Sequence, residues 1–150
     1  MLKILAVGNS FSQDATRHLE KTAACANSEL FVRNCHIGGC SLERHYSNIL
    51  SGEPAYDYQQ NGEFLEKISL SDALRRESWD FITVQQVSGL SGISESYHPY
   101  LEEVVSFLKK TSPDSRIVFH RTWQYEKGST HPDFVRYDSS PEFMVNCIRR

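Results

Sequence analysis

Apolar residues along the chain are concentrated in four short runs that polar, glycine-containing segments separate. Three of these runs are apolar almost throughout, and each predicts a strand buried on both faces. They are LKILAV at 2–7, WDFITVQ at 79–85 and RIVFH at 116–120. A fourth, weaker run of the same kind is ELFVRNC at 29–35.

Helical patterns lie between the predicted strands, near 14–27, 42–50, 71–77 and 98–110. Strand and helix therefore alternate, which is typical of an α/β domain with a parallel sheet. Polar loops follow the strands at 8–13, 36–41, 86–96 and 121–139. In open α/β sheets ligands bind at the carboxyl ends of the strands, so these loops are where a site is expected.

Two segments depart from this alternation. YDYQQNGEFLEK at 56–67 contains Asn61-Gly62, a strong hairpin pattern, and we expect it to form a surface excursion. Ser139-x-x-Glu142, with Pro141 in between, predicts the start of a helix near the end of the chain. A doubly wound domain normally continues to another strand, so we expect the C-terminal part of the fold to be missing from these 150 residues.

Size and composition fit a single domain at 1–150. The chain has a mass of 17.2 kDa, and 39% hydrophobic residues supply enough apolar material for one core. A net charge of −3 without runs of like charge argues against nucleic acid and acidic membrane surfaces as partners. The first apolar run is interrupted by Lys3 and is too short for a membrane span or a secretory leader. We therefore expect a cytoplasmic protein, or an already trimmed mature form, in which the four cysteines are free thiols.

Ser10 is the first candidate for chemistry, because it follows the first predicted strand in GNSFSQDA at 8–15. A strand-to-helix turn would expose its hydroxyl at the carboxyl edge of the sheet, as a nucleophile requires. A structural interpretation stays open, because Ser10-x-x-Gln13 is a capping box and Ser12 is an equally good cap.

Further candidates lie in the loops after the other strands. Gly38 and Gly39 let the backbone approach a ligand closely, or simply form a turn. Gln85 and Gln86 emerge from a buried strand, and only one of them can face the same side of the sheet as Ser10 because side chains alternate. HRTWQY at 120–125 supplies His120, Trp123 and Tyr125, which either line a cleft or pack with polar tips.

The spacing Cys35-x4-Cys40-x4-His45, with His36 nearby, invites a zinc interpretation. Structural zinc sites usually combine shorter paired spacings, so we expect neither a metal nor a cofactor.

The order of these segments resembles the SGNH (GDSL-like) hydrolase superfamily of esterases and lipases. ILAVGNSFS, GGCSLERH, WDFITVQQVSGLSG and TWQY look like an uncharacterised bacterial branch of it, and the resemblance spans about residues 2–148. Together with the alternation of strands and helices, it implies a flavodoxin-like three-layer α/β sandwich with a parallel sheet of about four strands.

The resemblance implies that Ser10 is the nucleophile and that the backbone N–H groups of Ser10 and Gly39 are oxyanion donors. The third donor of the superfamily, commonly an asparagine, is here replaced by Gln85 or Gln86, with Gln85 slightly favoured. Asn9 stands where the family usually has an aspartate. The remaining residues expected to bind substrate are Asn9, Gly38, Trp123 and His131.

The general base is where the chain departs from the family. Members carry a C-terminal Asp-x-x-His segment, and none of the six histidines here has an aspartate three residues before it. We therefore expect a chain that ends before its last strand and catalytic loop, with poor or no activity. His131, with Asp133 close by, is an alternative base in the loop after the fourth predicted strand.

Two functions are compatible with these residues. The first is a serine hydrolase for a small-molecule or carbohydrate ester, such as an O-acetyl group, in which Ser10 forms an acyl-enzyme. The second is a non-catalytic module that binds a carbohydrate or an anion with the same loops. A third interpretation is an incomplete product whose exposed sheet edge is covered by a partner or a second copy of the chain.

Overall fold

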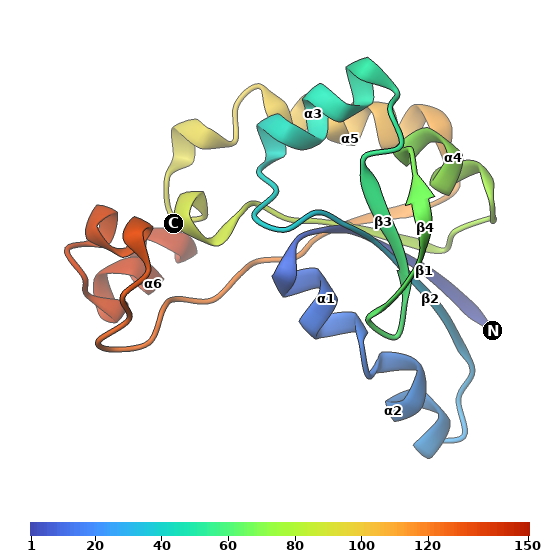
Figure 1. The fold of residues 1–150 in the computed structure, drawn as a ribbon, viewed down its shortest axis with the longest axis horizontal. Coiled ribbons are helices and arrows are strands. Elements are labelled where there is room, and N and C mark those ends of the chain that lie inside the picture. Colours follow the sequence, from blue (N-terminus) through green and yellow to red (C-terminus); the bar gives the residue numbers. More distant parts are fainter.

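The computed structural model covers residues 1–150 and contains a six-stranded sheet in the order β4-β3-β2-β1-β5-β6 (Figure 1). Four neighbouring strands are parallel and confirm the four predicted ones: β2 (Leu30–His36), β1 (Leu2–Gly8), β5 (Phe81–Val84) and β6 (Arg116–Phe119). The register of β1 against β2 runs from Leu2 opposite Leu30 to Gly8 opposite His36. The carboxyl ends of β1 and β2 therefore lie side by side.

Helices cover both faces of the sheet, so the predicted α/β sandwich is confirmed. One face carries α3 (Leu42–Ser51), α4 (Leu70–Arg75) and α5 (Tyr100–Thr111), and the main hydrophobic core lies beneath them. The other face carries α1 (Ser10–Thr16) and α2 (Leu19–Cys25). The single helix predicted near 14–27 is thus two shorter helices that meet around Arg17 and His18.

The predicted hairpin is present, but it is not a surface excursion. β3 (Tyr56–Gln60) and β4 (Glu63–Ile68) are joined by Asn61-Gly62, which have φ values of 53° and 83°. Two consecutive positive φ values are those of the tight hairpin turn that an Asn-Gly pair favours. β3 pairs antiparallel with β2 and extends the sheet. Alternation along β3 buries Tyr56 and Tyr58, and this burial holds the hairpin to the body of the domain.

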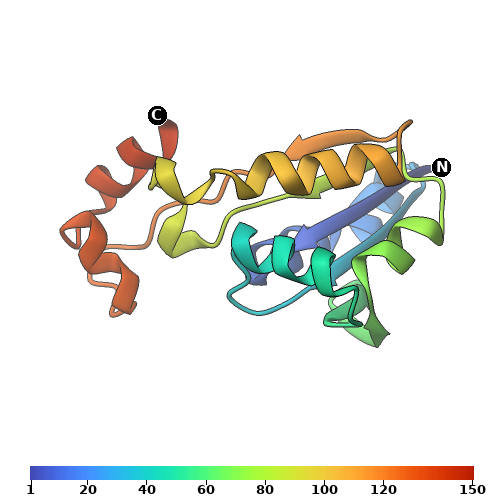
Figure 2. The same ribbon diagram turned by 90° about the horizontal axis from the view of Figure 1, so that it is seen from above.

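β6 is not buried on both faces, contrary to the expectation for 116–120. It is an edge strand, and Val118 and Phe119 are 42% and 39% exposed. After β6 the chain leaves the sheet for a short 3-10 helix, η3 (Pro132–Tyr137), and for α6 (Pro141–Arg149). Figure 2 shows this part beyond one end of the sheet, where Phe134, Tyr137 and Met144 form a small second core.

Two helix starts differ from the predicted caps. Asn9 caps α1, because its side-chain oxygen accepts the backbone N–H of Phe11, so neither Ser10 nor Ser12 is the cap. Ser140 caps α6, one residue after the expected Ser139, and Pro141 is the first helical residue. Two further 3-10 turns, η1 (Ser88–Leu90) and η2 (Ser94–Ser96), follow β5.

A polar cluster lies inside the main core beneath α3. His45 Nδ1 lies 2.9 Å from the Tyr56 hydroxyl and 3.5 Å from Cys40 Sγ, and all three side chains are fully buried. Burial lowers the pKa of His45 to about 4 and raises the pKa of the Cys40 thiol to about 12. The folded domain therefore holds this imidazole neutral and this sulfur as a thiol.

The lowered pKa of the buried His45 predicts that the domain loses stability in mild acid. Between its ordinary pKa of 6.5 and its folded pKa of about 4, the unfolded chain binds a proton that the folded chain does not. The free energy of unfolding should therefore fall as the pH is lowered through this window. Burial also lowers the pKa of His120, which adds in the same direction.

Urea denaturation at pH 7.5 and pH 5.0 measures this effect. In His45→Gln the drop in stability between the two pH values should be smaller than in the unmodified chain. His18→Gln is the matched control, because His18 is exposed, and it should keep the full drop. An unchanged drop in His45→Gln would contradict the assignment.

Candidate active site

Ser10 is the first residue of α1 and directly follows the carboxyl end of β1. Its side chain is exposed and makes no hydrogen bond within the chain. Its backbone N–H is one of the helix N-terminal donors that have no partner inside the helix. A free hydroxyl and a free N–H thus stand together at the edge where α/β proteins bind ligands.

Asn9 holds three strand ends together from beneath Ser10. The side chain is 1% exposed, and its oxygen accepts the Phe11 N–H at 3.2 Å and the Gln85 amide at 2.6 Å. Its own amide donates to the carbonyl of Cys40 at 3.0 Å. The end of β1, the end of β5 and the glycine turn after β2 are therefore linked through one buried carboxamide.

The glycine turn lies beside the end of β1. The N–H of Ile37 donates to the carbonyl of Gly8 at 3.1 Å, and the turn closes from Cys40 N–H to Ile37 carbonyl at 3.2 Å. Gly39 has a φ of 62°, which favours glycine. Gly38 and Gly39 are exposed, and the N–H of Gly39 has no acceptor in the protein. That N–H is free to donate to a ligand.

The two glutamines face opposite sides of the sheet, as alternation requires. Gln85 lies on the α1 side and packs so closely on Gly8 that a Cβ there would be 2.8 Å from it. Gln86 lies on the α3 side, where its oxygen accepts the N–H of Leu42 at 3.1 Å and its amide donates to Ser96. The side-chain oxygen and the amide of Gln86 therefore both have hydrogen-bond partners within the protein. Gln85 is also fully buried, but its side-chain oxygen has no partner and its amide makes only the bond to Asn9.

Trp123 places an aromatic side chain against Phe11, the residue after Ser10. Its ring packs on Phe11 with centroids 4.3 Å apart, and the side chain remains 49% exposed. Phe11 follows Ser10 in α1, so an exposed indole from the segment after β6 lies near the start of this helix.

His131 lies in the second core region and not in the glycine turn or at the end of β1. Its Nδ1 accepts the backbone N–H of Asp133 at 3.2 Å, and its ring stacks on Tyr125 at 4.5 Å. In this arrangement Nδ1 carries a lone pair, so it cannot donate to the Asp133 carboxylate as the histidine of a triad donates to its aspartate.

A histidine–carboxylate pair that we did not predict lies closer to the end of β1. His36 ends β2 opposite Gly8, and its Nδ1 is 3.7 Å from Asp57 Oδ2 on the adjacent strand β3. Asn34 contacts Ser12 of α1, and residues two apart share a face, so His36 lies on the α1 face of the sheet. Lys67 also binds Asp57, at 2.7 Å. Only the pairing of the hairpin with β2 brings Asp57 here, which explains why the local sequence did not reveal the pair.

Cys40 and His45, which invited the zinc interpretation, are both in the core cluster described above, and Cys35 is fully buried as well. No group of three His, Cys, Asp or Glu side chains in the structure is arranged to hold a metal ion. All four cysteines are unpaired.

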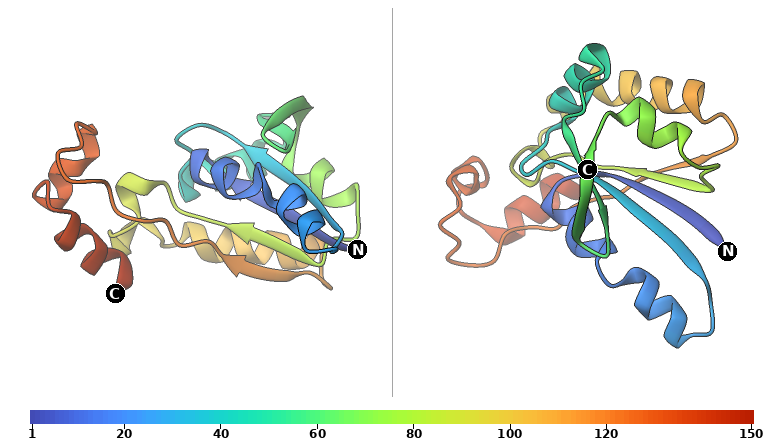
Figure 3. Two further views of the ribbon diagram at one scale, coloured as in Figure 1. Left: turned by 90° about the horizontal axis from the view of Figure 1, so that it is seen from below. Right: turned by 45° about the vertical axis from the view of Figure 1, so that its right-hand side comes forward.

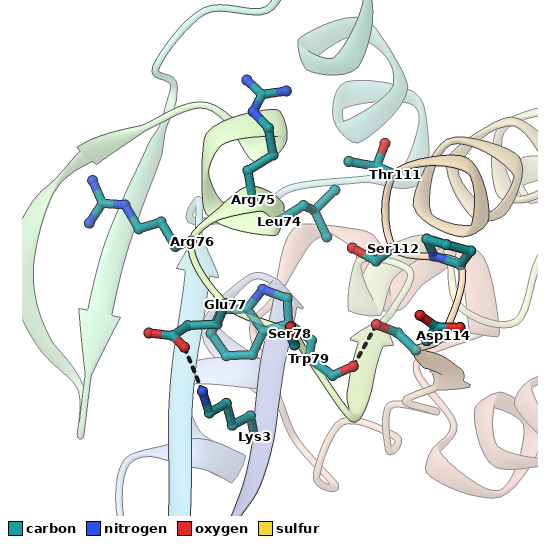
Figure 4. Close-up of a pocket in the computed structure, with 12 residues that line it drawn as sticks. Lys3, Leu74, Arg75, Arg76, Glu77, Ser78, Trp79, Thr111, Ser112 and Asp114 are labelled. Atoms are coloured by element: carbon teal, nitrogen blue, oxygen red, sulfur yellow. Dashed lines mark hydrogen bonds and ion pairs between the residues drawn. The ribbon is translucent and has the colours of Figure 1, made fainter.

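A cleft also lies at the opposite edge of the sheet, near the amino ends of β1, β5 and β6 (Figure 4). Its volume is about 470 Å³, and Lys3, Glu77 and Asp114 are among its lining residues. Lys3 and Glu77 form an ion pair of 2.6 Å, and the arginines that line the cleft pair with Asp72 and Glu66. Because all of these lining charges except that of Asp114 are paired within the protein, this cleft is a weaker candidate than the carboxyl edge.

The family model for DUF4886, a domain of unknown function, matches residues 3–150. The chain belongs to the DUF4886 family. A crystal structure of a DUF4886 protein from Bacteroides uniformis shares 38% sequence identity with this chain and superposes with a TM-score of 0.91. The match covers 98% of this chain and 60% of that one, so this DUF4886 chain spans about three-fifths of the length of that relative.

Two more distant structures share the fold of this DUF4886 chain. A candidate SGNH hydrolase from Slackia heliotrinireducens is 24% identical, with a TM-score of 0.59 over 99% of this chain and 70% of that one. LAE5, an α/β hydrolase from the metagenome of Lake Arreo in Spain, is 11% identical, with a TM-score of 0.54 over 99% and 71%. The fold is thus one that hydrolases use.

Comparison with curated proteins finds no match. None of the helices has the length and apolar character that crossing a membrane requires.

The central position of Asn9 predicts a large effect of its removal. Asn9→Ala would leave the Gln85 amide and the Cys40 carbonyl unpaired, and one buried unpaired group costs about 1–3 kcal/mol. The free energy of unfolding, measured in urea, should fall by at least this amount. Asn9→Asp loses the donor to Cys40 and adds a buried charge, but it keeps both acceptor bonds, which stabilise that charge, so its loss should be smaller. Equal stability of Asn9→Ala and the unmodified chain would contradict this role.

Proposed function

We propose that this DUF4886 domain is a serine hydrolase of SGNH type that cleaves acyl esters, including O-acetyl groups on carbohydrates. One observation supports it above all. The free hydroxyl of Ser10 stands at the carboxyl edge of the sheet, and the backbone N–H groups of Ser10 and Gly39 have no acceptor within the protein. A nucleophile beside unpartnered donors is the arrangement that acyl transfer requires.

In the proposed reaction Ser10 Oγ attacks the ester carbonyl carbon and gives its proton to a base. The two backbone N–H groups donate to the carbonyl oxygen as it becomes negative. The carbon–oxygen bond to the alcohol then breaks, the alcohol takes up the proton, and the acyl group remains on Ser10. Water attacks this acyl-enzyme in the same way and releases the acid.

We propose Gln85 as a positioning residue of the oxyanion hole. It faces the same side of the sheet as α1, and its amide donates to Asn9. Since it is fully buried behind Asn9, its effect on the oxyanion is through the position and polarity of the Asn9 and Ser10 backbone. We propose Gln86 as a positioning residue that joins the start of α3 to η2.

We propose His36, oriented by Asp57, as the base available within these 150 residues. His36 Nδ1 faces Asp57, which leaves Nε2 for proton transfer. The 3.7 Å separation is too long for a hydrogen bond, and Lys67 competes for the same carboxylate. Both facts weaken the base, so the expected turnover of this chain is low.

Ser10→Ala tests the nucleophile. The unmodified domain should be labelled by a fluorophosphonate probe and should hydrolyse p-nitrophenyl acetate, and Ser10→Ala should reduce both to background. Ser47→Ala is the matched control, since Ser47 is an exposed serine on α3, and it should leave both unchanged. Activity that persists in Ser10→Ala would refute the assignment.

His36→Gln tests the base. It should lower the rate of labelling about hundredfold, the lower range of general-base effects, while His131→Gln should have little effect. Asp57→Asn should slow labelling as His36→Gln does and shift its pH profile. If His131→Gln causes the larger loss, the loop after β6 supplies the base and His36 does not.

The second candidate function is a non-catalytic module for carbohydrates or anions. The unpartnered backbone N–H groups of Ser10 and Gly39 are donors that a bound anion also accepts. Thermal stabilisation by phosphate without fluorophosphonate labelling would support binding, whereas labelling at Ser10 would support the hydrolase.

A further inference from the structure

A small cavity lies between the segment after β6 and helix α6. Its volume is about 240 Å³, and it is lined by Arg121, Thr122, Trp123, Gln124, Val145, Ile148 and Arg149. Figure 3 shows this segment running from the edge of the sheet towards α6. The volume is below the ~300–1,000 Å³ of pockets for drug-sized ligands, so the cavity suits a group about the size of one sugar ring.

Trp123 gives this cavity an aromatic wall. The indole is 49% exposed, although its ring also packs on Phe11. The C–H faces of a pyranose ring are apolar and pack well on a large aromatic ring whose edge can donate a hydrogen bond. An indole left this exposed against Phe11, the residue after Ser10, therefore favours a sugar over a long acyl chain.

Thr122 supplies an unused polar group at the same place. Its side chain is 5% exposed, and its hydroxyl is buried without any hydrogen-bond partner. Buried hydroxyls are normally paired, so this one keeps the capacity for a hydrogen bond to a water molecule or to a ligand that reaches it. Gln124, also on the wall, adds a side-chain amide.

The charge of the cavity is entirely positive. Arg121 and Arg149 both line it and neither forms an ion pair, while no aspartate or glutamate is part of the lining. A guanidinium binds a carboxylate through two parallel hydrogen bonds. The cavity is therefore suited to a ligand with a negative charge.

We propose that this cavity binds one ring of an acidic carbohydrate, such as a uronic acid. Trp123 stacks on the ring, Thr122 and Gln124 bond to its hydroxyl groups, and Arg121 and Arg149 hold its carboxylate. The assignment of this sugar as part of a substrate rests on the proposed function, because the link to Ser10 is the contact of Trp123 with Phe11, the next residue of α1. Binding itself does not require Ser10 to be catalytic.

The test is a titration of the 150-residue chain, followed by the two indole N–H resonances in nuclear magnetic resonance spectra. Trp79 is 3% exposed and donates to the Ala73 carbonyl, so its resonance is an internal control. Methyl β-D-glucuronide should shift the Trp123 resonance and leave that of Trp79 in place. Methyl β-D-glucoside should bind at least tenfold more weakly, and sodium acetate should not reproduce the shift.

Variants of the lining residues test whether methyl β-D-glucuronide binds in this cavity. Arg149→Gln should weaken the binding of methyl β-D-glucuronide about tenfold, whereas Lys110→Gln, an exposed unpaired cation at the end of α5, should not. Thr122→Val should also weaken it. Ser10→Ala should bind as the unmodified chain does, so failure of the hydrolase proposal and failure of this one are separable.

Three results would overturn the inference. They are an unmoved Trp123 resonance, equal affinity for the neutral and the acidic sugar, and an equal shift by acetate, which would indicate an anion site without sugar recognition.

Discussion

The candidate site depends on one buried carboxamide. Asn9 accepts two hydrogen bonds and donates one, and its three partners lie in α1, directly after β5 and in the turn after β2. Because the side chain is almost fully buried, these bonds are not exchanged with water, and none can be lost without an unpaired polar group. The exposed groups above it, Ser10 and Gly39, are thereby held by a constraint that lies entirely inside the protein.

An aspartate at position 9 would accept the same two bonds but could not donate to the Cys40 carbonyl. The asparagine therefore adds a connection to the glycine turn that a carboxylate cannot make. It also leaves no negative charge beneath the place where the oxyanion of the proposed reaction would develop. Both consequences favour a well-placed donor at Gly39, so the departure from the usual aspartate is compatible with the proposed chemistry.

The sequence alone predicted the features that depend on local residue patterns. It did not predict the features that depend on which strands pair with each other. The four parallel strands, the Asn61-Gly62 turn and the helix after Ser10 follow from periodicity and turn chemistry. The attachment of β3 to β2 does not, because nothing in 56–60 specifies its neighbour. For the same reason the contact of His36 with Asp57 and the role of Asn9 became visible only in three dimensions. The exposure of β6 was missed because an apolar edge strand and an apolar central strand have the same pattern.

The parts of the proposed site differ in how firmly the fold holds them. The nucleophile and its donors rest on the sheet edge, whereas His36 relies on a carboxylate that also pairs with the 57% exposed Lys67. The exposed Lys67–Asp57 ion pair is weak, but it still competes with His36 for the Asp57 carboxylate and so weakens the orientation of the His36 imidazole. The Trp123 cavity, by contrast, combines two unpaired guanidinium groups with a buried free hydroxyl. Within these 150 residues the proposed oxyanion donors are therefore held more firmly than the proposed base, and a stronger base would raise the turnover of the proposed reaction without rearranging the donors.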